Sequence, residues 1–277
     1  SYARSALSTA QHLLVPRGLR LFGGGAQAAL AAYGVIQGMS LPILLFPAAL
    51  IAVIADLIVP ELTEAQVQGR LRGLGYMLER LYRLGLFFSM AVAGACFFFA
   101  HPLGELIYSE PAAGQYIRLL APLVPIMYMD TLVDGMLKGV GEYRANMRYN
   151  IIDAATGLLL VWLLLPRYGV AGYLFSISAT ELLNFALSAA RLTRVTVFRL
   201  QPLCWLLTAA AAVGGWWLLR LIFGRLLSRT GQPLILLLLV FLYLACYGAA
   251  LLLCGALRRE ELSWLFSLLR GEKSPKT

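Results

Sequence analysis

The chain has 277 residues, of which 60% are hydrophobic and 13% are charged, and its mean hydropathy is +0.76. Soluble domains carry about 25% charged residues, so this composition excludes a soluble globular protein and indicates an integral membrane protein. The net charge of +9 does not indicate nucleic-acid binding, because most of the basic residues lie between the apolar blocks, where the positive-inside rule expects them.

The apolar residues form long blocks and not the short alternating strands of an outer-membrane barrel. Lipid offers backbone polar groups no partner outside their own segment, so we predict an all-α integral membrane fold. The blocks predict about eight spans, the first of them truncated. They cover residues 1–15, 26–59, 84–100, 116–137, 145–165, 169–190, 203–223 and 233–255.

The first block is too short to cross a membrane. It offers about 15 residues before Pro16, whereas a span needs about 20. The chain also does not begin with methionine. We therefore expect this chain to be a piece of a longer protein.

The second block is too long for one straight crossing, and it contains Pro42 and Pro47. Proline removes a helical hydrogen bond and clashes with the preceding turn, so we predict helix kinks at these two residues. Kinked helices occur where a bundle opens and closes, but they are also common in membranes. Both a gating role and a purely structural role stay open.

Basic residues are concentrated in alternate connections, at 70–83, 138–148 and 191–199, and in the tail. This bias predicts a multi-pass protein of the cytoplasmic membrane whose C-terminus is cytoplasmic. Two segments, 63–83 and 257–277, have apolar residues on one helical face and arginines elsewhere. We expect both to be amphipathic helices on the cytoplasmic surface, with membrane lipid as their partner.

No pattern in the chain indicates a metal, a cofactor or a catalytic site. No two of the four cysteines form a CxxC pair, and nothing resembles the phosphate-binding loop GxxxxGK[ST]. The two histidines, His12 and His101, have no partners at metal-ligand spacing. A membrane enzyme would need a clustered acid–base or metal set, so we predict that the protein is not an enzyme.

Charged residues cluster around the turn at Gly141. Asp130, Asp134 and Lys138 are one helical turn apart and share a face. Folding the chain back at Gly141 brings Asp134 level with Arg148. We predict that Asp134, Lys138 and Arg148 form a structural charge lock at the cytoplasmic end of a helical hairpin.

The same fold-back brings Asp130 near the level of Asp153, deeper in the bilayer. Ionisable residues inside a span usually face the bundle interior or water. Two alternatives stay open for this pair: a structural contact, or the lining of a water-filled path.

Other polar residues also lie within the blocks. Arg4 has no local acid and lies about 18 Å from the outer end of its helix, which makes it the best candidate for holding an anionic ligand. Glu181 and Asn184 share one face of the sixth block, and both a structural role and a functional role stay open for them. The candidates for lining a substrate path are Arg4, Gln37, Asp130, Asp153, Glu181 and Asn184.

Several stretches resemble the stage V sporulation protein B family, in the order in which that family has them. They are RSALSTAQHLLVPRGL, AAYGVIQGMSLPILLFP, IVPELTEAQV, DGMLKGVGEYRANMRYNIIDA, LLPRYGVAGY and ELLNFALSAARL. That family belongs to the multidrug/oligosaccharidyl-lipid/polysaccharide exporter superfamily and is similar to the lipid II flippases.

The resemblance implies a 14-helix protein with two six-helix lobes and two extra C-terminal helices. Residues 1–200 then correspond to the second lobe, 201–256 to the extra pair, and 257–277 to the cytoplasmic tail. The N-terminal lobe would be a missing partner. A single lobe cannot form a cavity that opens alternately to the two sides of the membrane, so we expect transport only when the other lobe is supplied.

The resemblance also implies alternating access that moves a polyprenyl-linked oligosaccharide or peptidoglycan precursor outward, for cell wall or spore cortex synthesis. Arg4 matches the cavity arginines that grip a pyrophosphate in the relatives. The chain departs from the lipid II flippases in GVIQGMSLPILLFP, which lacks their arginine. The alternative is a multidrug antiporter in which Asp130 and Asp153 exchange a coupling cation. A further alternative is a truncated remnant of a transporter that has only an assembly role.

Overall fold

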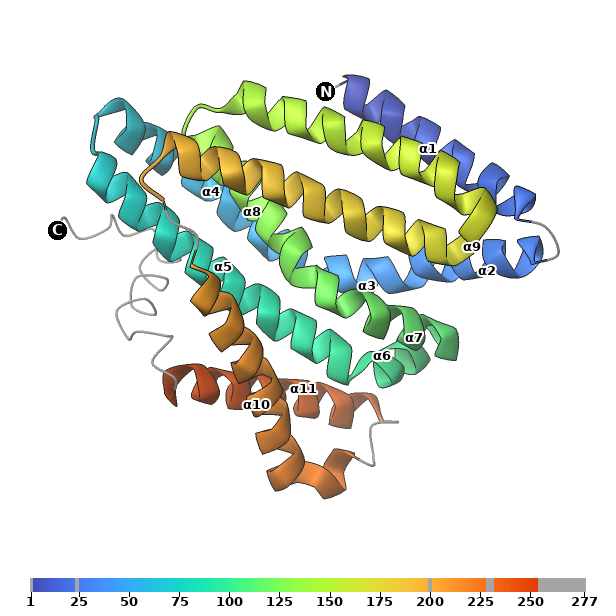
Figure 1. Ribbon diagram of the computed structural model, residues 1–277. Helices are drawn as coiled ribbons and strands as arrows, with labels where there is room; N and C mark the ends of the chain where they lie inside the picture. The colour runs from blue at the N-terminus through green and yellow to red at the C-terminus, as the bar shows by residue number, and fades with distance from the viewer. Residues whose placement is uncertain (1, 23–24, 199–200, 228–231, 254–277) are drawn as a thin grey trace.

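The computed structural model describes residues 2–22, 25–198, 201–227 and 232–253, and within these ranges every regular element is a helix (Figure 1). The predicted all-α membrane fold is confirmed. Six helices of the described chain are long and apolar enough to cross a membrane: Ala26–Leu45, Leu71–Phe98, Pro111–Gly139, Tyr143–Val195, Pro202–Gly224 and Pro233–Leu253.

The helices, in chain order, are α1 (Tyr2–Leu21), α2 (Ala26–Val35), the π-helix η1 (Ile36–Ser40), α3 (Leu41–Leu45), α4 (Ala48–Val67), α5 (Leu71–Phe98), α6 (Ala100–Tyr108), α7 (Pro111–Leu120), the 3₁₀-helix η2 (Ala121–Leu123), α8 (Val124–Gly139), α9 (Tyr143–Val195), α10 (Pro202–Leu227) and α11 (Pro233–Leu253).

The second predicted block is interrupted twice in the structure. The π-helix η1 separates α2 from α3, and Pro42 lies in the first turn of α3. A turn at Phe46 and Pro47 then separates α3 from α4. A π-helical turn carries an extra residue and often occurs at functional sites.

The segment α9 is a hairpin of two arms, 143–168 and 170–195, and Figure 1 shows the chain reversing between them. Gly169 makes the reversal with φ 55° and ψ −129°, a backbone conformation that side chains disfavour. A Cβ at Gly172 would lie 2.8 Å from the carbonyl oxygen of Leu164. The arms therefore touch through their backbones near the reversal.

The core of the bundle is built around α8, which packs against α4, α5 and α9. The hydroxyl of Tyr128 is fully buried and donates to the carbonyl of Leu44 at 2.6 Å. Gly135 lets α8 approach α4 closely, because a Cβ there would lie 2.7 Å from the Cβ of Ala55. Small residues allow such close crossings between membrane helices.

One end of the bundle is held by an ion pair between the start and the end of α9. Arg191 donates from Nε and Nη2 to the Glu142 carboxylate at 3.1 and 2.9 Å. At the same end, the Thr63 hydroxyl donates to the carbonyl of Gly139 at 3.0 Å. These contacts fasten the turn between α8 and α9 to both neighbouring helices.

The predicted surface helix over 63–83 is wrong as a separate element. Its first residues end α4 and its remaining residues begin the long helix α5. Leu74, Leu78 and Leu81 are buried in the core, because the apolar face packs inside the bundle. The predicted amphipathic tail, 257–277, lies outside the described residues.

Helices α10 and α11 form a pair that lies along α5 (Figure 1). The indole of Trp205 donates to the hydroxyl of Tyr82 at 3.0 Å, and the hydroxyl of Tyr247 donates to the carbonyl of Phe87, also at 3.0 Å. Both contacts join this pair to α5 and not to α1 or α9.

The close approach of α8 to α4 is testable. We expect Gly135→Ala to lower the free energy of unfolding by about 1–3 kcal/mol, because the added methyl overpacks the crossing at Ala55. The apparent thermal midpoint in detergent measures this change. Gly73→Ala on α5 is the matched control, because a Cβ there meets nothing within 4 Å; equal midpoints for the two variants would contradict this account of the packing.

Candidate functional site

A buried polar site lies between α8 and the two arms of α9. Asn184, which is only 4% exposed, donates from Nδ2 to Oδ2 of Asp130 at 2.8 Å. The remaining oxygens, Oδ1 of Asp130 and Oδ1 of Asn184, are buried without a hydrogen-bond partner among the described residues. Two acceptors in this pair therefore lack a donor.

One turn further along α8, Asp134 is bonded to both arms of α9. Asn150 of the first arm donates to its Oδ2 at 3.0 Å, and Ser188 of the second arm donates to its Oδ1 at 3.1 Å. Asn146 donates to the backbone carbonyl of Asp134 at 3.0 Å. This carboxylate thus holds the three helical segments in register.

Asp130 interacts electrostatically with three other acids, Asp134, Glu181 and Asp153. That Asp130 and Asp153 lie at a similar depth stays a prediction. Among the described residues no group of three His, Cys, Asp or Glu is placed to hold a metal ion. The site combines a carboxylate with two buried acceptors that lack donors among the described residues, which suits a proton or a weakly coordinated monovalent cation.

A second polar group joins η1 to the second arm of α9. The hydroxyl of Tyr173 donates to Oε1 of Gln37 at 2.9 Å, and its ring meets that of Tyr33 edge to face at 5.0 Å. Tyr173 is buried, whereas Gln37 is exposed. The π-helical turn therefore presents an amide that a buried tyrosine orients.

Of the six candidates for a substrate path, Asn184 is hydrogen-bonded to Asp130, and Asp153 and Glu181 interact electrostatically with Asp130. Gln37 lies in the second polar group. The backbone of Arg4 belongs to α1, but its side chain is outside the described residues.

The predicted charge lock of Asp134, Lys138 and Arg148 stays a prediction. In the structure, neutral donors from Asn150 and Ser188 bond the two oxygens of Asp134. The side chain of Arg148 is exposed and that of Lys138 is half-buried. Neutral donors satisfy a buried carboxylate without burying a second charge, whereas a long basic side chain can reach solvent from this end of the hairpin.

Sequence reasoning missed Asn146, Asn150, Ser188 and Tyr173. The spacing of Asn146 and Asn150, four residues apart, places both on one helical face, and two amides within an apolar block are a usable signal. No comparable pattern distinguishes Ser188 or Tyr173, because single hydroxyls in membrane helices often bond to their own backbone.

Comparison with known proteins gives two relatives. Over 185 residues the chain is 26% identical to Stage V sporulation protein B of Bacillus subtilis (strain 168), a match that covers 66% of this chain and 36% of that protein. Over 160 residues it is 22% identical to Sporulation protein YkvU of the same organism, covering 58% of this chain and 36% of that protein. The matched region is thus little more than a third of the length of each relative.

The MatE family model matches residues 20–163. This range runs from the end of α1 to the first arm of α9, and it includes Asp130, Asp134 and Asp153. Because the match covers more than half of the 277 residues, the chain belongs to the MatE family.

Proposed function

We propose that this chain is one lobe of a transporter that moves polyprenyl-linked oligosaccharide or peptidoglycan precursors across the cytoplasmic membrane by alternating access. The proposed role is in cell wall or spore cortex synthesis. An N-terminal lobe is the proposed partner, because a cavity between two lobes is needed for alternating access. Similarity to two proteins named for sporulation supports this choice of process.

The buried pair of Asp130 and Asn184 is the observation that carries the proposal. A carboxylate with a purely structural role has its oxygens satisfied, as those of Asp134 are. Asp130 instead keeps one buried oxygen without a donor, next to an amide oxygen in the same condition. A proton or a monovalent cation would satisfy both oxygens and offset the repulsion from the neighbouring acids.

The position of this pair suits a coupling site. It joins α8 to the second arm of α9, and Asp134 joins α8 to both arms one turn away. A cation that binds one arrangement of these segments better than another would shift the population toward that arrangement. We propose that binding and release at Asp130 drive the change of access.

The exposed amide of Gln37 supports a sugar headgroup as the substrate. It lies beside two tyrosines, and aromatic rings with a few oriented polar groups are typical of ligand sites. Arg4 is the proposed contact for the pyrophosphate that links the sugar to the lipid, because guanidinium binds phosphate oxygens in pairs. Substrate and cation would then occupy separate places in the lobe.

The role of Asp130 can be tested in the protein that carries this chain together with its N-terminal lobe, reconstituted in proteoliposomes. We expect Asp130→Asn to lower cation-driven transport about tenfold, within the usual range of coupling energies, because the amide keeps the shape but loses the charge. Transport of a fluorescent lipid-linked sugar is the measurement. Asp56→Asn is the matched control, since Asp56 is exposed on α4; undiminished transport by Asp130→Asn would exclude the coupling role.

Charge reversal tests the proposed phosphate contact. We expect Arg4→Glu to abolish transport of the lipid-linked sugar, because a carboxylate repels the pyrophosphate. Arg20→Glu, at the exposed other end of α1, should leave transport unchanged. Normal transport by Arg4→Glu would remove this residue from the site.

The second candidate function is a cation-coupled multidrug antiporter, and the cluster of acids around Asp130 favours it equally. The two functions differ in cargo. We expect cells that express the protein to show unchanged sensitivity to cationic drugs but altered levels of wall precursors. Cation-dependent drug efflux, with normal precursor levels, would instead establish the antiporter.

A further inference from the structure

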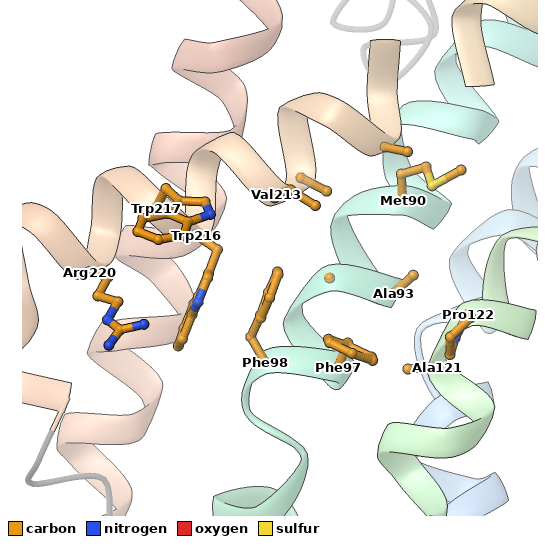
Figure 2. Close-up of a pocket in the computed structure, with 13 residues that line it drawn as sticks. Met90, Ala93, Phe97, Phe98, Ala121, Pro122, Val213, Trp216, Trp217 and Arg220 are labelled. Atoms are coloured by element: carbon orange, nitrogen blue, oxygen red, sulfur yellow. The ribbon is translucent and has the colours of Figure 1, made fainter. Parts of the chain in front are cut away.

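A groove of about 400 Å³ runs between α5 and α10 and is bounded at one side by the start of η2. Figure 2 shows its lining, in which the rings of Phe98 of α5 and Trp216 of α10 lie parallel to each other. We call this feature the α5–α10 groove. Its lining contains no residue of α8 or α9, so it is separate from the polar site described above.

The side chains that line the groove differ between its two ends. One end is lined by small and aliphatic side chains, including Ala93, Ala209 and Ala212. The other end carries the stacked rings of Phe98 and Trp216, whose centroids are 4.5 Å apart. Along α10, the distance from Ala209 to Arg220 is about 16 Å at the rise of an α-helix.

The aromatic end also carries positive charge. The guanidinium of Arg220 lines the groove and lies over the ring of Trp217 at 5.9 Å. Figure 2 places these two side chains together at one end of the lining. On the facing side, the guanidinium of Arg118 lies over the ring of Phe97 at 5.1 Å, and Phe97 also lines the groove.

This order of groups matches a lipid molecule. Acyl chains need an apolar channel, tryptophan is enriched at the level where chains meet headgroups, and arginine binds phosphate oxygens. Both walls of the groove belong to membrane-spanning helices. The surrounding membrane therefore supplies lipids next to the groove.

We infer that the α5–α10 groove binds a glycerophospholipid with a net negative headgroup. One acyl chain lies along Ala93 and Ala212, the glycerol lies at the level of Trp216, and the phosphate contacts Arg220. The apolar lining over most of the length excludes a free phosphate as the occupant. A volume of about 400 Å³ suits a slender chain and not a further helix.

Quenching of tryptophan fluorescence by brominated phospholipids tests the assignment. The chain, in a Trp162→Phe, Trp264→Phe background, is placed in nanodiscs of phosphatidylcholine with brominated phosphatidylglycerol or brominated phosphatidylcholine of the same acyl chains. We expect phosphatidylglycerol to bind about fivefold better, the factor that one basic residue typically contributes to holding an anionic lipid. Arg220→Gln should reduce this preference to near unity.

Matched variants separate the groove from the rest of the lipid-facing surface. Arg20→Gln, on α1, should keep the full preference. Val213→Phe fills the groove and should reduce quenching by both lipids, whereas Leu221→Phe, at a residue 83% exposed on the same helix, should not. The proposal is overturned if the Trp162→Phe, Trp264→Phe protein prefers neither lipid, or if Arg20→Gln loses as much preference for phosphatidylglycerol as Arg220→Gln. It is also overturned if the tryptophan fluorescence of Val213→Phe and Leu221→Phe is quenched to the same extent.

Discussion

The architecture of the lobe depends on how two carboxylates are accommodated inside a membrane-spanning helix. A charged group in a span is costly unless polar partners surround it. Asp134 receives hydrogen bonds from Asn150 and Ser188, one on each arm of α9, and Asp130 receives one from Asn184. Because these donors come from segments far apart in the chain, satisfying the carboxylates also fixes α8 between the two arms. The same contacts therefore determine both the packing and the chemistry.

Backbone geometry makes that arrangement possible. Gly169 reverses the chain so that the two arms of α9 lie side by side, and Gly135 lets α8 approach α4 at the depth of the polar site. The polar and apolar sides of α8 are thus both specified by close contacts. Asp130 differs from Asp134 because one of its oxygens has no donor among the described residues. That difference is the basis for assigning structure to Asp134 and coupling to Asp130.

The two proposed sites differ in charge and polarity, and therefore in the ligand that each would bind. The site at Asp130 combines negative charge with buried acceptors and suits a small cation. The α5–α10 groove combines an apolar channel with an arginine, Arg220, at one end and suits an anionic lipid. The helix α5 separates them, since α8 packs on one side of it and α10 on another. Each site can therefore be altered by substitution without direct contact with the other.

The sequence by itself determined the all-α membrane class and the approximate limits of the helices. Hydrophobic block length and helical rise are local properties, so they can be measured along the chain. Only the tertiary structure decided that neutral donors from Asn150 and Ser188 bond the oxygens of Asp134. It also decided that Leu74, Leu78 and Leu81 are buried within the bundle and that Tyr173 orients Gln37. These contacts join segments up to 136 residues apart, and which side chains meet across such distances depends on packing that no local pattern records.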